Sequence, residues 1–365
     1  MIDDGIMRPE ERAAFALQGL YRRYGYLPFR MSRFEEYDFY ARNKDFLVSD
    51  RIITFTDSRG RLLALKPDVT LSIIKSGSDR QGCRQRLCYN EKVFRAAGSM
   101  GDFKEITQAG LECIGDLDVY DRFEVVSLAL ESLSLLGEEY VLNLSHLGLL
   151  NALLGVLGED SVLSRRAARC IASRNEQELE ALCREAGLSE ETVKEFRFLA
   201  GLHAPLTEAI VQLAPCCVSE AAKDALAELR SLEDLLSEAG CTERICFDFA
   251  VVNNRKYYNG LVFQGFLSGV PESVLAGGQY DRLMARMGRK ASGIGFAVYL
   301  DRLMPCSDGN GADVDVLLLY ADPASVPAEV SRLQAEGKSV SAQREIPKKL
   351  RYRELVDLRG GAQDA

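Results

Sequence analysis

The stretch CYNEKVFRAAGSMGDFKEITQAGLECIG, residues 88–115, predicts two strands joined by a glycine-containing loop. We expect the first strand to end at Phe94 and Arg95, the turn to span 98–102, and the second strand to run over 106–114. The remaining segments are most simply arranged around this predicted hairpin, so the interpretation of the chain starts here.

Polar residues alternate along the second strand. Gln108, Gly110 and Glu112 are spaced by two, so they face the same side of a strand. A glutamine and a carboxylate therefore share one face, and the glycine between them would leave bare backbone for a ligand to approach. A solvated hairpin face fits the same pattern, and this stretch alone does not distinguish the two.

The composition is that of a globular protein of 365 residues, with 47% hydrophobic and 27% charged residues. This length allows one large domain and a smaller one. No run approaches the roughly 18 apolar residues of a membrane span, and the acidic, polar N-terminus is not a secretory signal, so we expect a cytoplasmic protein. The net charge of −9 disfavours a nucleic-acid partner, and the basic stretch 348–353 is interpreted as a solvated helix face.

The cysteines do not form a metal-binding pattern. There are ten of them, without a CxxC spacing, and only two histidines, His146 and His203, accompany them. We therefore expect free thiols in a reducing compartment, and neither a metal site nor a cofactor.

Periodicity and turn signals give the order of the elements. In the first part they predict a helix at 8–24, a strand at 26–32, a hairpin turning at 57–60, a helix at 70–76, a helix at 118–136 and a strand at 139–144. Strands then disappear until residue 245. The last part predicts a long hairpin over 247–267 turning at 253–254, a strand ending at 277–278, a helix at 280–287, a segment 292–303 leading into a last helix, a strand at 314–320, and a helix at 323–336.

These elements indicate the α+β class, with an antiparallel-rich sheet flanked by helices and interrupted by a helical insertion. We expect five parts: the first half of the core at 1–145, the helical insertion at 146–242, the second half of the core at 243–304, a linker at 305–312, and a truncated α/β remnant at 313–365.

Six segments in order resemble the core of the class II histidyl-tRNA synthetases: KPDVT (66–70), VFRAA (93–97), QAGLE (108–112), YYNGLVF (257–263), AGGQYDRL (276–283) and GIGFAVYLDR (293–302). Each motif is weak alone, but together they cover roughly residues 8–303. The resemblance implies a class II synthetase-like antiparallel sheet of six or seven strands with flanking helices, and a homodimer.

The residues that such synthetases use to activate an amino acid with ATP are replaced. The motif glutamate position holds Ala97, the normally basic loop carries Asp102, and Asp301 replaces a second glutamate. Tyr299 stands at a glycine position, where we expect its ring to occupy the space of the adenine, and Asn253 replaces an arginine. The resemblance thus implies that no catalytic residues for adenylation remain.

The resemblance implies that the amino-acid pocket is retained. Asp68, Thr70 and Gln108 match the groups that hold the α-ammonium of histidine, and Glu112 and Tyr258 match those that read its imidazole. The chemistry agrees, because carboxylate, hydroxyl and amide oxygens suit an ammonium, and a carboxylate with a phenol can satisfy both ring nitrogens.

The carboxylate of the ligand has a less complete set of partners. Arg95 would supply positive charge near it, and Arg255 or Lys256 could take the role lost at Asn253. Tyr257 is assigned to the same pocket, although both neighbouring tyrosines also fit a hydrophobic core.

A synthetase-like chain without activation residues or a complete anticodon-binding domain resembles the family of regulatory subunits of ATP phosphoribosyltransferase. The resemblance implies a non-catalytic subunit that a short-form catalytic subunit needs for activity, that confers feedback inhibition by L-histidine on the first step of histidine biosynthesis, and that forms a homodimer within a hetero-oligomer. Two alternatives stay open. Arg95 and Arg302 would fit a divergent adenylate-forming enzyme, and a tRNA-binding module without catalysis is disfavoured by the acidic charge.

Overall fold

The computed structural model describes residues 7–47, 51–77, 84–97, 102–158, 161–251, 257–303 and 312–359. The chain divides into two compact units, Met1–Leu303 and Met304–Ala365, and each is described by itself. In the part of the chain that the structure describes, no helix combines the length and the apolar character needed to cross a bilayer.

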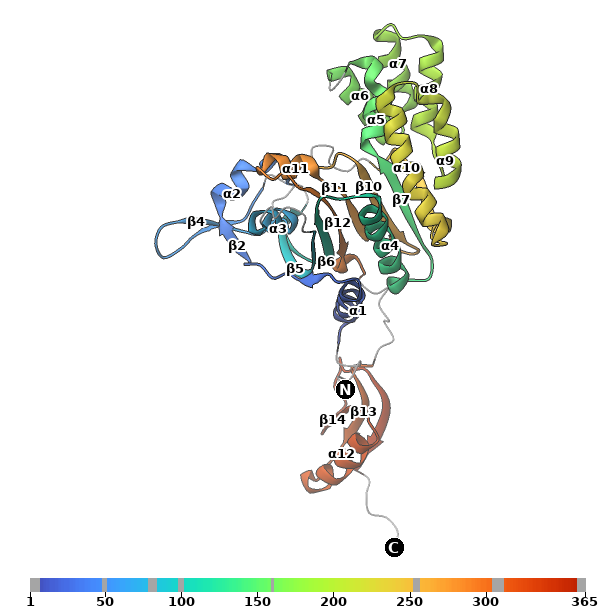
Figure 1. Ribbon diagram of the computed structural model, residues 1–365. Coiled ribbons are helices and arrows are strands. Elements are labelled where there is room, and N and C mark those ends of the chain that lie inside the picture. The colour runs from blue at the N-terminus through green and yellow to red at the C-terminus, as the bar shows by residue number, and fades with distance from the viewer. Residues whose placement is uncertain are drawn as a thin grey trace. The chain divides into compact units, whose positions relative to one another are not determined.

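The first unit is built on a nine-stranded sheet with the order β1-β5-β6-β12-β11-β10-β7-β9-β8 (Figure 1). Neighbouring strands are antiparallel except in the pairs β1–β5 and β7–β9. The α+β, antiparallel-rich architecture is as predicted, but the sheet is larger than the six or seven strands expected. The strands are β1 (Leu27–Pro28), β5 (Gln85–Ala97), β6 (Asp102–Gly115), β7 (Tyr140–His146), β8 (His203–Pro205), β9 (Ile245–Asp248), β10 (Leu261–Leu267), β11 (Leu275–Gln279) and β12 (Ser292–Tyr299).

The central hairpin is the pair β5–β6, whose register runs from Gln85 opposite Ile114 to Ala97 opposite Asp102. Both strands are longer than predicted, and the loop 98–101 lies outside the described residues. Strand β12 pairs with the other edge of β6 and places Gly295 opposite Glu112. The polar face of β6 therefore lies between two strands rather than at an edge.

The two faces of the sheet carry different layers. Helices α1 (Pro9–Arg23) and α4 (Val119–Leu136) cover the face of β6 that bears Leu111 and Cys113. The opposite face bears Gln108, Glu112 and Ile114, where Ile114 joins a smaller core with α3 (Thr70–Ser76) and α11 (Asp281–Arg286). The period of two in β6 thus separates an apolar helix-packing face from a polar face.

A small three-stranded sheet lies beside this second layer, formed by β2 (Phe34–Glu36), β4 (Leu62–Leu65) and β3 (Thr54–Thr56), with α2 (Tyr37–Arg42) between β2 and β3 in sequence. The predicted hairpin β3–β4 forms, and its turn contains Gly60 at φ +79°, a conformation that favours glycine. The predicted strand 26–32 is mostly wrong, because only Leu27–Pro28 pairs with β5.

The segment 146–242 consists mainly of helices: α5 (Leu147–Leu153), α6 (Val162–Ala172), α7 (Glu176–Glu185), α8 (Glu190–Gly201), α9 (Leu206–Leu213) and α10 (Glu220–Glu238), with short 3-10 turns. Five of these helices begin at side-chain N-caps, namely His146, Ser161, Asn175, Ser189 and Ser219. The expectation that strands are absent here is wrong, because β8 pairs antiparallel with β9 and extends the core sheet.

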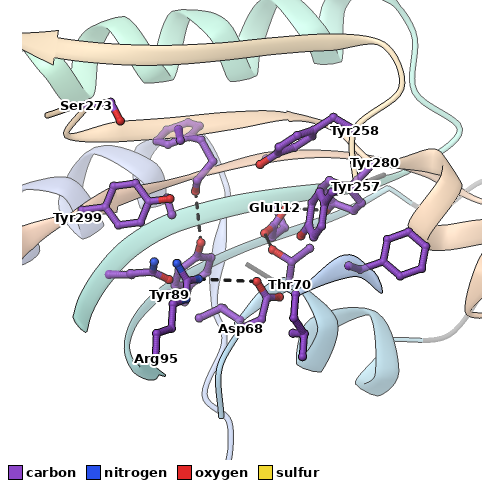
Figure 2. Close-up of a pocket in the computed structure, with 18 of the residues that line it drawn as sticks. Asp68, Thr70, Tyr89, Arg95, Glu112, Tyr257, Tyr258, Ser273, Tyr280 and Tyr299 are labelled. Carbon is purple, nitrogen blue, oxygen red and sulfur yellow. Dashed lines mark hydrogen bonds and ion pairs between the residues drawn. The ribbon is translucent and has the colours of Figure 1, made fainter. Parts of the chain in front are cut away.

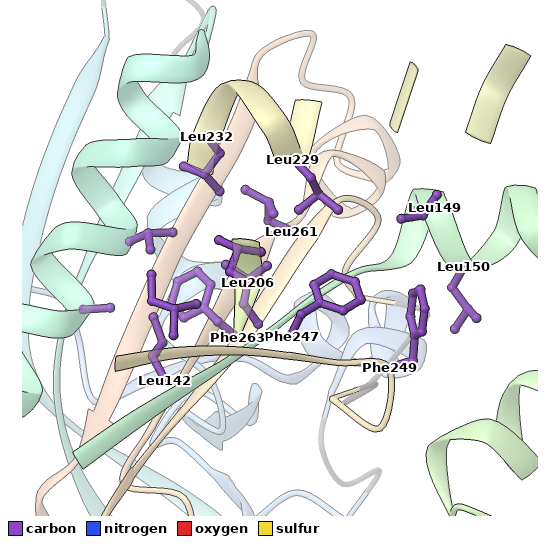
Figure 3. Close-up of a cluster of buried hydrophobic side chains, with 14 of the residues drawn as sticks. Leu142, Leu149, Leu150, Leu206, Leu229, Leu232, Phe247, Phe249, Leu261 and Phe263 are labelled. Atoms are coloured by element: carbon purple, nitrogen blue, oxygen red, sulfur yellow. The ribbon is translucent and has the colours of Figure 1, made fainter. Parts of the chain in front are cut away.

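An apolar cluster joins these helices to the sheet (Figure 3). Leu206 of α9 and Leu229 of α10 are buried with Phe247 of β9 and Phe263 of β10. The ring centroids of Phe247 and Phe249 lie 4.9 Å apart in an edge-to-face arrangement. The helical segment and the sheet therefore share one core, although the predicted domain boundaries themselves stay predictions.

The predicted hairpin over 247–267 is wrong. Its two strands, β9 and β10, both exist, but β7 lies between them and pairs with each. The predicted turn at 253–254 lies outside the described residues. Two strands that follow each other in the sequence can thus be separated in the sheet by a strand from earlier in the chain. Local sequence patterns do not reveal such an insertion. At the end of the segment 292–303 the residues Leu300–Leu303 form the 3-10 turn η5, and the residues 304–311, where the last helix was expected to continue, lie outside the described residues.

The second unit has a parallel three-stranded sheet with the order β14-β13-β15. Its elements are β13 (Val314–Leu319), α12 (Val326–Ala335), β14 (Val340–Gln343) and β15 (Tyr352–Asp357). The strand and helix predicted here form, but β14 and β15 were not anticipated. The interpretation of 348–353 as a helix face is wrong, because this stretch leads into β15 at Tyr352.

Candidate functional site

A cavity of about 920 Å³ opens on the polar face of β6 and β12. It lies within the first unit and has a size typical of ligand pockets. All seven residues assigned to the site from sequence line it, namely Asp68, Thr70, Arg95, Gln108, Glu112, Tyr257 and Tyr258. Segments from four separate parts of the chain therefore converge on one pocket (Figure 2).

Glu112 lies at the inner end of this cavity and is only 2% exposed. The Thr70 hydroxyl donates to its Oε1 at 2.5 Å, and the Tyr280 hydroxyl donates to its Oε2 at 2.6 Å (Figure 2). Burial raises the pKa of Glu112 to about 8, an effect that the two hydroxyl hydrogen bonds oppose and the nearby Asp68 charge reinforces. This carboxyl is therefore far less acidic than an ordinary glutamate.

The segment that carries Asp68 and Thr70 is fixed to β5 at successive residues. Lys66, fully buried, places its Nζ 2.7 Å from Glu91 Oε2. Its carbonyl accepts from the Phe94 amide at 2.9 Å, and the next carbonyl, of Pro67, accepts from Arg95 Nε at 2.9 Å. These contacts position the start of helix α3 against the hairpin.

Asp68 stands at the turn into α3 and is 14% exposed at its side chain. Its Oδ1 accepts from the Leu71 amide at 2.8 Å, while Arg95 Nη2 lies 3.9 Å from its Oδ2. Burial raises the pKa of Asp68, and the Arg95 charge and backbone amides oppose that shift. Of the two carboxyl groups assigned to the site from sequence, Asp68 and Glu112, only Asp68 has a cationic neighbour among the described residues.

Gln108 is 2% exposed and faces the cavity. Among the residues that the structure describes, its Nε2 has no hydrogen-bond partner. Buried polar groups are rarely left without a partner, so this amide is suited to a ligand acceptor.

Gly110 does not expose bare backbone, contrary to our expectation. A Cβ at this position would lie 2.5 Å from the Tyr89 hydroxyl oxygen and 2.2 Å from the Phe296 carbonyl. The Tyr89 hydroxyl itself donates to that carbonyl at 3.3 Å. The glycine makes room for a packed tyrosine, and the ring of Tyr89 forms a wall of the cavity.

Three tyrosines form the opposite wall. The ring centroid of Tyr257 lies 4.7 Å from that of Tyr258 and 5.9 Å from that of Tyr280. Sequence reasoning missed Tyr280 as a site residue, although it lies in the segment AGGQYDRL that we had singled out. A Cβ at Gly293 would lie 2.2 Å from the Tyr280 ring, and one at Gly295 would lie 2.0 Å from Glu112 Oε2. The two glycines of GIG therefore make space for this pair.

The other end of the cavity is lined by Ser273, Tyr299 and Arg302. Arg302 is already engaged: its Nε lies 3.2 Å from Glu272 Oε2, its Nη1 donates to the Ser273 carbonyl, and its guanidinium carbon lies 4.3 Å from the centre of the Tyr299 ring. In Figure 2 Tyr299 and Ser273 lie across the pocket from Tyr280.

Some residues predicted to matter for the site lie in segments that the structure does not describe. Asn253, Arg255 and Lys256 lie outside the described residues, as does most of the loop that precedes Asp102. Within the described ranges, no group of three or more histidine, cysteine, aspartate or glutamate side chains could hold a metal ion. The eight cysteines in those ranges are free thiols.

The chain resembles known proteins over most of its length. Residues 6–303 match the family model of histidyl-tRNA synthetase. A relative from Moorella thermoacetica, an ATP phosphoribosyltransferase regulatory subunit, is 30% identical over 350 residues, which cover 92% of this chain and 89% of the relative.

Solved structures show the same fold. An ATP phosphoribosyltransferase regulatory subunit/histidyl-tRNA synthetase from Bacillus halodurans superposes with a TM-score of 0.76 at 23% identity and covers 99% of both chains. A chain from the ATP phosphoribosyltransferase complex (HisG:HisZ) of Thermotoga maritima superposes with a TM-score of 0.63 at 20% identity, over 80% of this chain and 98% of the other. The class II synthetase-like fold predicted from the motifs is thus confirmed.

Proposed function

Because this chain belongs to the regulatory subunits of ATP phosphoribosyltransferase within the histidyl-tRNA synthetase family, we propose that it senses L-histidine for a short-form catalytic subunit. The catalytic subunit depends on this chain for activity, and histidine bound to this chain lowers that activity. The reaction so controlled is the first step of histidine biosynthesis.

The observation that carries this proposal is the convergence of the predicted residues on one cavity. Asp68 and the Oε1 of Gln108 supply acceptors for the ligand ammonium, while Glu112 and Tyr258 face the ring. The Nε2 of Gln108, which has no partner among the described residues, and the side chain of Arg95 can supply donors for the ligand carboxylate.

Regulation requires that histidine bind one state of the complex more tightly than another. A difference of about 1–3 kcal/mol in binding free energy is typical of such coupling and changes affinity by roughly 5–150-fold. By reciprocity, if histidine changes the affinity of this chain for the catalytic subunit, assembly changes histidine affinity by the same factor. The Thermotoga maritima structure, solved as a complex, supports a hetero-oligomer for this chain as well. We further propose a homodimer within that assembly and a cytoplasmic location, with which the free thiols agree.

The test is calorimetric titration of the full chain with L-histidine, followed by reconstitution with a short-form catalytic subunit. Glu112→Ala removes the group at the inner end of the pocket, so we expect at least a 100-fold loss of histidine affinity, about 3 kcal/mol, with assembly intact. Glu105→Ala on the exposed part of the same strand is the matched control and leaves affinity unchanged.

Three results would contradict the proposal: unchanged affinity in Glu112→Ala, no activation of the catalytic subunit by the unmodified chain, or activity of the complex that histidine does not affect. Pyrophosphate exchange with ATP by this chain alone would instead favour the adenylate-forming alternative. Retention of labelled tRNA on a filter would favour the tRNA-binding one.

A further inference from the structure

Glu112 has only neutral hydrogen-bond partners. Its two oxygens each accept from one hydroxyl, that of Thr70 and that of Tyr280. Within the described ranges, no lysine, arginine or histidine lies within ion-pair distance of it, whereas Asp68 in the same cavity has Arg95 at 3.9 Å. A carboxyl with 2% exposure and no cation is costly to ionise, because burial disfavours the charged form.

The other groups around the cavity do not reverse this preference. Arg95 on β5 is directed to Asp68 and the Pro67 carbonyl, and Arg302 at the far end is held by Glu272. The remaining titratable groups that line the cavity are Lys44 and Asp45 of the 3-10 turn η1 (Lys44–Phe46), Tyr89 of β5, Tyr257, Tyr258 and Tyr280, and Tyr299 of β12. The negative charge of the nearby Asp68 also disfavours ionisation of Glu112.

We propose that Glu112 is protonated in the empty pocket and donates a hydrogen bond to an unprotonated ring nitrogen of the ligand. The site then selects amino acids with a neutral, proton-accepting azole ring, rather than cationic side chains. This inference rests on the proposed histidine-sensing function and assigns the protonation state of both partners. With each carboxyl oxygen already accepting one hydroxyl bond, the O–H of Glu112 is left for the ligand.

The proposal predicts how many protons accompany binding. A free imidazole has a pKa near 6.5, and the pKa of Glu112 is raised to about 8. Between these two pH values the ring is therefore mostly neutral and Glu112 mostly protonated before they meet, so binding requires little proton uptake. Proton uptake by the Glu112–ring pair is therefore about 0.2 at pH 7.5 and rises to about 0.8 at pH 8.5, as Glu112 ionises in the free protein.

Calorimetry of the full chain with L-histidine, in buffers of different ionisation enthalpy at these two pH values, measures the uptake. The contribution of the ligand ammonium follows from the titration of histidine itself and is subtracted. Uptake near 0.9 or more at both pH values would mean that Glu112 is already ionised in the free protein and that the ring binds as imidazolium. Uptake near zero at both would mean that Glu112 is ionised in the free protein and accepts a hydrogen bond from a neutral ring. Either result overturns the inference.

A second measurement uses an analogue. β-(1,2,4-Triazol-3-yl)alanine has the shape of histidine, but its ring is a much weaker base and a better N–H donor. We expect it to bind at least tenfold more weakly at pH 7.5, and equal or tighter binding would contradict a donating Glu112. We expect the histidine affinity of the unmodified chain to fall above pH 8, as Glu112 ionises. In Glu112→Gln, which keeps the shape of the protonated acid, the remaining affinity should not show this fall. Absence of histidine binding by the unmodified chain at every pH would reject the proposed function itself, not this inference alone.

Discussion

The charged residues at the two ends of the cavity differ in the partners that bind them. At the inner end Glu112 is bound only by hydroxyls. At the other end Arg302 is bound by a carboxylate, a backbone carbonyl and an aromatic ring. The family resemblance placed the histidine subsite at the first end and the former nucleotide subsite at the second.

Under the proposed function, this difference distinguishes a ligand site from the remnant of one. A buried polar group that lacks its full complement of partners until a ligand binds costs stability in the unliganded protein. Arg302, in contrast, forms an ion pair with Glu272 within the chain. Identity of the residue alone therefore does not establish function, since both Glu112 and Arg302 match the family motifs.

The largest expected effect concerns pH and the unliganded chain. The pKa of Glu112 is raised in the folded protein, so its contribution to stability is fully present below its unfolded value of about 4.5 and is lost as pH rises through about 8. The loss amounts to at most about 5 kcal/mol. We expect Glu112→Gln to remove this loss, as measured by denaturant unfolding between pH 5 and pH 9. Parallel stability curves for the two proteins would contradict the pKa shift.

A smaller effect is expected from filling the space beside Glu112. Gly295→Ala introduces a Cβ 2.0 Å from Glu112 Oε2 and 2.4 Å from the Leu111 carbonyl. Overpacking of this kind costs about 1–3 kcal/mol, and the displaced carboxyl should also lose histidine affinity.

The matched control for Gly295→Ala is Gly155→Ala, where a Cβ meets no atom within 4 Å. Chemical denaturation and calorimetric titration report the two effects separately. If Gly295→Ala kept the stability and affinity of the unmodified chain, the close packing of β12 against Glu112 would be disproved.

The smallest effect is expected at the other end. ATP should change the unfolding midpoint of the chain by less than about 1 °C, because Tyr299 lines the former nucleotide subsite and Arg302 is engaged by Glu272. Histidine serves as the positive control in the same thermal-shift experiment. A clear upward shift with ATP would show that this end still binds a nucleotide, and the contrast between the two ends would disappear.

Local spacing predicted the elements that carry several site residues, and the family resemblance assigned those residues to a pocket. Gln108 and Glu112 alternate on one strand, and Thr70 begins the helix expected there. Tyr280 escaped prediction because its contact with Glu112 depends on the long-range register of β12, where Gly293 clears space for its ring. The position of β7 between β9 and β10 was missed for a similar reason, since pairing partners distant in sequence leave no local signal.

Strand β8 couples the helical segment to the core sheet through backbone hydrogen bonds. Three residues, His203–Pro205, pair with β9 at the end of the sheet, between helices α8 and α9. Opening of the helices by local fluctuation would therefore break sheet hydrogen bonds as well, so amide hydrogen exchange in β9 should slow or quicken together with exchange in α9. A regulatory signal that changed the packing of these helices would then reach the strand next to β7 through the backbone itself.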